Sequence, residues 1–298
     1  MTASAISGAA DNAIHEAKPW LEKLARAGFV AKGLLYMTIG ALATAAALGL
    51  GRSTTGQMSA AGHAGPASTM GQRGAMAALL QAPAGRALLI AIAVGLFGYA
   101  AWRFIEAIRD PMHHARSENK KKAKGILKRL RSAALGIIQV ALGISALKIA
   151  FGNIEAANDG KASAHWTGKA LATPGGELVL WAIAGGLVAY GVYQLYKAWA
   201  SKLSKELMLG RLSSGARRLV IGASRFGIAA RGIVFATTGI LVGRAILQRD
   251  PQQVKGIKAS LIELLELGRW PFAIVAMGLI AYGIYQLINA RYRRIEIA

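Results

Sequence analysis

Three tyrosines recur at one position of a repeated segment, and they are the first residues whose type and spacing could do chemistry. Each follows a glycine by four residues within an apolar run: Tyr99, Tyr190 and Tyr282. Gln139 adds a polar group inside another apolar run. A phenol at membrane depth needs a hydrogen-bond partner. These four residues are a candidate polar core. The hydroxyls could line a central cavity, or each ring could fill the space beside a glycine, and we favour the packing interpretation.

Cations are the next candidates. Lys32 and Arg231 begin about one turn inside an apolar run, where a long side chain can usually reach the headgroups. We therefore expect both to extend toward the membrane surface. No acidic residue lies centrally in an apolar run, because Glu106 and Glu177 are both terminal. Transport coupled to protons or sodium usually needs a buried carboxylate, so the sequence disfavours it.

Catalytic signatures are missing from the sequence. There is no cysteine, which excludes thiol chemistry, disulfides and cysteine metal sites. None of the five histidines lies in an apolar run, and no phosphate loop, zinc-helix signature, nucleophile elbow or dinucleotide fingerprint is present. We expect no catalytic, cofactor-binding or metal site, no cofactor and no enzymatic activity.

Six apolar runs position these residues, and each is long enough to cross a bilayer as a helix. They cover 29–49, 86–108, 133–151, 177–199, 226–247 and 270–290. The sequence therefore predicts an all-α, polytopic membrane helical bundle. Short helices are expected in the membrane interface near the N-terminus and before each even run, over 73–85, 165–176 and 255–268.

The runs form three tandem two-helix repeats. In the odd runs, residues 26–40 match residues 225–239, including Gly33 with Gly232 and Gly40 with Gly239, and residues 129–143 are a weaker copy. Each repeat has an even number of spans, so all three are parallel and could surround a pseudo-threefold axis. We divide the chain into an N-terminal cytoplasmic tail with an interfacial helix (1–23) and three membrane repeats (24–110, 111–202 with a basic linker, and 203–298). The paired glycines should allow neighbouring backbones to approach closely.

Charge sets the expected orientation. Of 36 Lys and Arg residues, 21 fall in the termini and the loops that follow even runs, and nine fall in the other loops. The positive-inside rule then places both termini in the cytoplasm of a multi-pass inner-membrane protein. The net charge of +22 is explained by this bias, and no nucleic acid is expected as a partner.

A basic run precedes the third span and suits the anionic headgroups of the cytoplasmic leaflet. It comprises Lys120, Lys121, Lys122, Lys124, Lys128, Arg129 and Arg131. The expected partners are therefore the lipid bilayer and, as an open alternative, another membrane protein or a second copy of the chain.

The repeat unit resembles that of the bacterial integral membrane proteins of domain-of-unknown-function family 1206. The likeness is strongest in the first repeat, which carries Arg26, Gly28, Lys32, Gly33, Tyr36, Pro83, Gly85, Gly95, Leu96 and Tyr99. The second repeat departs from the pattern at Arg131, Leu135 and Gln139, and the third at Phe235 and Glu266. The resemblance implies a bacterial membrane protein and supplies no activity or site residue.

Two functions follow as expectations. The favoured one is a non-enzymatic membrane scaffold, a bundle that binds a partner or lipid. The alternative is a channel or facilitator for a small solute or ion along the pseudo-threefold axis.

Overall fold

The architecture comes from a computed structural model that describes residues 3–49, 71–108, 119–153, 159–200, 213–250 and 257–292. The described ranges contain helices and no strand, which confirms the predicted all-α class. The helices are α1 (Ala3–Ala47), α3 (Gln72–Leu80), α4 (Gly85–Ile108), α5 (Asn119–Ala150), α6 (Asp159–Leu171), α7 (Gly176–Ala200), α9 (Ser214–Leu247), α10 (Ile257–Glu266) and α11 (Arg269–Tyr292).

Six of these helices are long and apolar enough to span a membrane, as the sequence predicts. The spans are Arg26–Ala47, Gly85–Ile105, Ser132–Ala150, Gly176–Ala200, Ser214–Leu247 and Arg269–Tyr292. The expected helices before the even spans are present as α3, α6 and α10.

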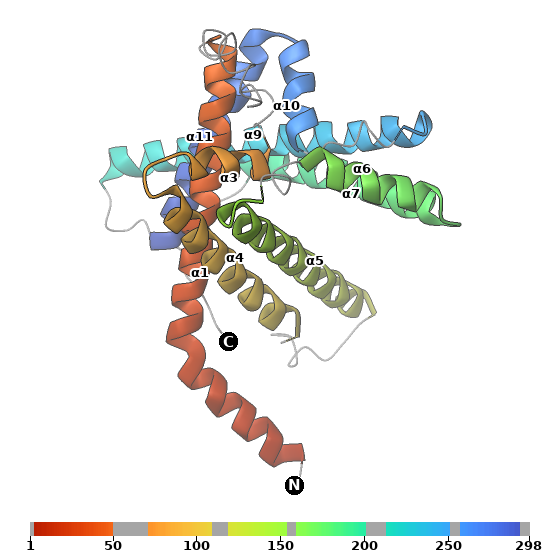
Figure 1. Cartoon of the computed structure of the whole chain (residues 1–298). Helices are drawn as coiled ribbons and strands as arrows, with labels where there is room; N and C mark the ends of the chain where they lie inside the picture. The colour runs from red at the N-terminus through yellow and green to blue at the C-terminus, as the bar shows by residue number, and fades with distance from the viewer. Residues whose placement is uncertain are drawn as a thin grey trace.

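The N-terminus differs from the prediction. The expectation of a tail with a separate short interfacial helix was wrong, because α1 continues as one helix from Ala3 through the first span (Figure 1). The segment is rich in alanine, the strongest helix former, and Pro19 does not end the helix.

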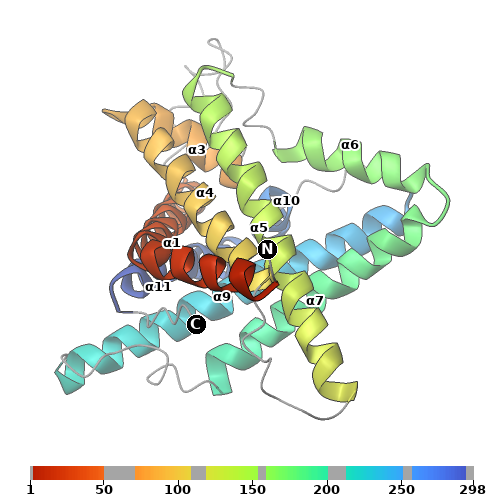
Figure 2. The same ribbon diagram turned by 90° about the horizontal axis from the view of Figure 1, so that it is seen from below.

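The spans associate as three antiparallel pairs, α1 with α11, α4 with α5 and α7 with α9. The α4–α5 and α7–α9 pairs each join the even helix of one repeat to the odd helix of the next. The α11–α1 pair joins the third repeat to the first in the same way. The pairs run in markedly different directions in both views (Figures 1 and 2). In addition, α1 contacts α4 and α9 contacts α11. The repeats therefore interlock through neighbouring repeats more than through their own hairpins.

The paired glycines of the odd helices make these pairs. A Cβ on Gly40 would lie 2.8 Å from the Ala276 carbonyl oxygen of α11, and one on Gly232 would lie 2.9 Å from the Gly191 carbonyl oxygen of α7. In α5, a Cβ on Gly143 would lie 2.9 Å from the Phe97 ring of α4. Each glycine removes the side chain that would otherwise separate the helices, so the predicted close approach is confirmed.

The turns into the first two even spans also depend on glycine. A Cβ on Gly85 or Gly176 would collide with the backbone at the end of the preceding outer helix, at Leu79 and Ala170. The residue before each glycine has a left-handed backbone, with φ of 59° at Ala84 and 78° at Gly175. The Pro-x-Gly sequence therefore folds α3 and α6 back against α4 and α7.

Candidate functional site

Arg231 lies where α1, α7, α9 and α11 meet, and three tyrosines surround its guanidinium group. Its Nε donates to the Tyr36 hydroxyl at 3.2 Å, and its Nη1 donates to Tyr190 at 3.2 Å and to Tyr282 at 2.8 Å. The guanidinium carbon also lies 4.8 Å from the centre of the Tyr282 ring and 4.9 Å from that of Phe235. We call these five residues the Arg231 cluster.

The expectation that Arg231 extends to the membrane surface was wrong. One residue comes from each of α1, α7 and α11, and the hydroxyls of Tyr36, Tyr190 and Tyr282 all reach the guanidinium. Hydrogen bonds to a charged donor, together with the negative faces of the rings, offset much of the cost of leaving water. A cation inside a helix can thus point inward when its neighbours supply acceptors, which the sequence of α9 alone does not show.

The Arg231 cluster has more hydrogen-bond donors than acceptors. Within the described part of the chain, Nη2 of Arg231 donates to no group and no carboxylate pairs with the guanidinium. The hydroxyls of Tyr36, Tyr190 and Tyr282 all accept from Arg231, and none of them donates to another described residue. An arginine and three hydroxyl groups with unused protons are suited to binding an anion.

Tyr99 occupies the same repeat position as Tyr190 and Tyr282 but belongs to a separate cluster. Lys32 Nζ lies 3.3 Å from the centre of the Tyr99 ring, and Arg103 donates to the Tyr99 hydroxyl from Nε at 2.9 Å and from Nη2 at 2.5 Å. Phe29 packs edge-on against the ring at 5.6 Å. Lys32, like Arg231, is directed to an aromatic ring.

The candidate polar core is therefore divided. The structure brings Tyr190 and Tyr282 together on Arg231 and places Tyr99 with Lys32 and Arg103. Gln139 is buried on α5, and its Oε1 has no hydrogen-bond partner among the described residues. It shares a helical face with Gly136 and Gly143, which pack on α4. The Tyr99 side chain lies in the space beside Gly28, whereas Gly227 lies against the backbone of Tyr282.

The sequence alone did not predict that Arg231 points inward or that Tyr36 accepts a hydrogen bond from it. A signal was present, since Arg231 aligns with Lys32 in the first repeat and both are cations one turn inside a span. What the sequence lacked was the pairing of α1 with α11 and of α7 with α9, which brings three tyrosines from three helices to one side chain.

Two other arginines join the ends of α1 and α11. Arg26 Nη1 donates to the carbonyl oxygens of Ala290 at 2.6 Å and Arg291 at 3.0 Å, at the C-terminal end of α11. Arg269, at the start of α11, donates in turn to the Ala47 carbonyl at the end of α1. Each cation meets the negative end of the partner helix, so these contacts serve the packing of the pair.

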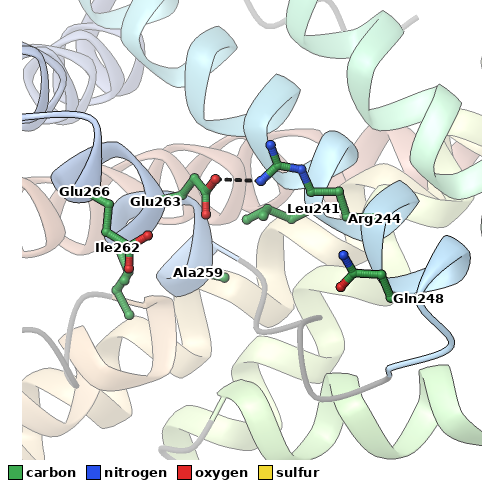
Figure 3. A pocket seen from close by; sticks show the side chains of 7 residues that line it. All are labelled: Leu241, Arg244, Gln248, Ala259, Ile262, Glu263 and Glu266. Atoms are coloured by element: carbon green, nitrogen blue, oxygen red, sulfur yellow. Dashed lines mark hydrogen bonds and ion pairs between the residues drawn. The ribbon is translucent and has the colours of Figure 1, made fainter.

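A surface groove of about 440 Å³ lies between α9 and α10 (Figure 3). It is lined by Leu241, Arg244, Gln248, Ala259, Ile262, Glu263 and Glu266. Arg244 and Glu263 pair at 2.7 Å, with Arg244 exposed and Glu263 partly exposed. A pair of this kind at the surface contributes about 0–1 kcal/mol.

The predicted lipid contact at Lys120, Lys121, Lys122, Lys124, Lys128 and Arg131 lies outside the residues whose side chains the structure describes. Their backbone forms the first turns of α5, continuous with the third span. Among the residues that the structure does describe, no group of His, Asp or Glu side chains could hold a metal ion.

Comparison with known proteins agrees with the repeat architecture. The family described as Domain of Unknown Function (DUF1206) matches residues 27–110, 130–201 and 226–293, one segment for each repeat. "Uncharacterized protein YxxB" of Bacillus subtilis (strain 168) is 26% identical over 280 residues, covering 93% of each chain. No solved structure gives a significant match. The chain, a multi-pass membrane protein by its six apolar helices, belongs to the DUF1206 family.

Proposed function

We propose that the protein is a non-enzymatic membrane bundle that binds an anionic lipid. The donor excess of the Arg231 cluster is the observation that carries this proposal, because an anion is the ligand that would use Nη2 and the free hydroxyl protons. In this proposal the protein lies in the bacterial inner membrane with both termini in the cytoplasm. The basic run at the start of α5 would then attract anionic headgroups to the same leaflet.

The Arg231 cluster also favours a bundle over a channel. One guanidinium joins α9 to α1, α7 and α11, and Tyr36 and Tyr282 pack edge-on at 4.7 Å at that junction. A path through this point would have to separate those contacts for each ion that passes. A resident cation would also repel sodium or potassium.

Lipid binding can be tested by native mass spectrometry of the full chain. The protein is purified from nanodiscs that contain phosphatidylglycerol and phosphatidylcholine, and the retained lipids are counted. We expect selective retention of phosphatidylglycerol, and we expect Arg231→Gln to weaken it by about tenfold. Arg244→Gln is the matched control, because this arginine lies in the same helix and pairs with Glu263 instead.

Equal retention of both lipids, unaffected by Arg231→Gln, would contradict lipid binding at this site. Anion release from proteoliposomes that requires Arg231 would support the channel in its place. The thermal unfolding of each variant, measured in the same detergent, shows whether a loss of binding reflects loss of the fold.

A further inference from the structure

Gln194 of α7 lies beside the Arg231 cluster and is bonded to it. Its Nε2 donates to the Tyr190 hydroxyl at 3.1 Å, the same oxygen that accepts from Arg231 Nη1 at 3.2 Å. A Cβ on Gly232, the residue after Arg231, would lie 3.1 Å from the Cβ of Gln194. Gln194 and Arg231 are therefore neighbours that share one hydroxyl group.

The two bonds limit what the Tyr190 hydroxyl can still do. A phenol oxygen that accepts from two donors has its own proton left to offer. Tyr190 donates that proton to no described residue. The Tyr190 hydroxyl and Arg231 Nη2 are thus two donors that a bound anion could use together.

Gln194 adds a group of the opposite kind, an acceptor. The residue is only 6% exposed, and its Oε1 accepts from no described residue. Arg231 Nη2 likewise has no partner in the described part of the chain. An atom without a partner is either enclosed by the protein or open to a molecule from outside, and neither of these two atoms is enclosed. A ligand that reaches the guanidinium therefore finds an unused acceptor beside it.

The equivalent positions of the other repeats make different contacts. The residue four positions after the repeated tyrosine is Arg103 in the first repeat, Gln194 in the second and Gln286 in the third. Arg103 and Gln194 each donate to the hydroxyl of the tyrosine one turn before them. Gln286 instead accepts from Asn289 at 3.5 Å and bonds no tyrosine hydroxyl among the described residues. Gln194 is thus the glutamine that contacts the Arg231 cluster, and Gln286 is its natural reference.

The direction of α7 determines which part of a lipid would meet Gln194. The helix runs from Gly176 to Ala200, and its C-terminal end is cytoplasmic in the proposed orientation. Gln194 is then one turn, about 6 Å, nearer to the cytoplasm than Tyr190. A lipid of the inner leaflet has its acyl chains toward the midplane and its headgroup alcohol toward the cytoplasm. If its phosphate is at Arg231, its headgroup alcohol lies on the side of Gln194.

We infer that Gln194 selects the headgroup, because its Oε1 accepts a hydrogen bond from a headgroup hydroxyl of the anionic phospholipid whose phosphate is bound at Arg231. This inference rests on the proposed function and names the headgroup class, an uncharged polyol such as glycerol. An ammonium headgroup also carries donors, but the resident guanidinium repels its charge. A lipid without a headgroup hydroxyl covers Oε1 and leaves it without a donor, which lowers the affinity.

Two lipids and two glutamines give a matched test. Phosphatidylglycerol and phosphatidylpropanol have the same charge and the same number of headgroup carbons, but phosphatidylpropanol has no headgroup hydroxyl. Retention of each lipid over phosphatidylcholine is measured by native mass spectrometry for the full-length wild type, Gln194→Leu and Gln286→Leu. Gln286→Leu changes the same repeat position, and no hydrogen bond among the described residues joins Gln286 to the Arg231 cluster. The comparison of the two lipids on the wild type needs no substitution.

We expect the wild type and Gln286→Leu to bind phosphatidylglycerol about two- to tenfold more tightly than phosphatidylpropanol, the effect of one uncharged hydrogen bond. Gln194→Leu should remove this difference by weakening phosphatidylglycerol alone. Equal loss of both lipids in Gln194→Leu would mean that Gln194 only supports Tyr190, and a preference that survives would place the hydroxyl contact elsewhere; either result overturns the inference. If the wild type binds both lipids equally while Arg231→Gln weakens both, the headgroup assignment is wrong and the proposed function stands. If Arg231→Gln weakens neither lipid, both are wrong.

Discussion

Tyr282→Phe should lower the free energy of unfolding as long as Arg231 is present, because it leaves a donor of that arginine without its acceptor. The change removes the acceptor of the shortest bond of the cluster, at 2.8 Å, and leaves an N–H of Arg231 without a partner. An unsatisfied buried donor costs about 1–3 kcal/mol. Polar contacts between membrane helices average about 0.6 and reach about 1.7 kcal/mol. We therefore expect Tyr282→Phe to lower the free energy of unfolding by about 1–2 kcal/mol.

Removing the arginine itself has two opposing effects on the free energy of unfolding. Arg231→Met deletes all three hydrogen bonds, worth roughly 2–5 kcal/mol together at the values for membrane helices. It also removes a charge from the span, which relieves about 2.5–3.5 kcal/mol. The two effects nearly cancel, so Arg231→Met should change stability by less than about 3 kcal/mol in either direction. In that background Tyr282→Phe should be almost neutral.

A double-mutant cycle measures the coupling energy between Tyr282 and Arg231. Unfolding in mixed micelles, followed by the fluorescence of the six tryptophans, gives the free energy for each variant. We expect a coupling energy of about 1–2 kcal/mol between Tyr282→Phe and Arg231→Met. Tyr99→Phe is the control at the same repeat position, since Tyr99 bonds Arg103, and its effect should add to that of Arg231→Met within about 0.5 kcal/mol. Equal coupling in both cycles would refute the assignment of Tyr282 to Arg231.

Three further predictions concern the helix pairs and the orientation. Arg26→Ala and Arg269→Ala each remove a donor to the carbonyl end of the partner helix. Each should lower the free energy of unfolding by about 1 kcal/mol, and a lower midpoint temperature in thermal unfolding will show this. Gly40→Leu should overpack against α11 and lower the free energy of unfolding by about 1–3 kcal/mol or prevent folding. Gly186→Leu should be tolerated, because the Cβ position there is open. The yield of monodisperse protein in gel filtration compares the two variants. Ser59 lies between the first and second spans, in a loop that the proposed orientation puts outside. Ser59→Cys should therefore react with an impermeant thiol reagent added outside spheroplasts, and reaction only after lysis would reverse the orientation.

The spans and repeats could be read from the sequence because both depend on local patterns. Apolar runs of bilayer length specify the six helices, and glycines at fixed offsets mark the surfaces that pack. Gly40 identifies a packing surface on α1, but only the fold shows that α11 covers it. Pairing between repeats is a long-range property, and each odd helix has three even helices of similar sequence as candidate partners.

Side-chain direction was the other missing information. Arg231 near the end of an apolar run is compatible with a headgroup contact or an inward contact, and the choice depends on Tyr36 and Tyr190 from distant parts of the chain. The sequence also marks the second repeat as different. Arg131 and Leu135 depart from the repeat pattern in α5, and among the described residues α5 makes at most marginal contact with α7.

The pairing of α1 with α11 has a consequence for synthesis. α1 precedes its main partner α11 by more than two hundred residues, so its surface at Gly33 and Gly40 stays exposed to lipid until α11 has been inserted. The α4–α5 and α7–α9 pairs, in contrast, can assemble as soon as their second helix enters the bilayer. A chain in which α11 has not yet been inserted leaves Gly33 and Gly40 of α1 uncovered.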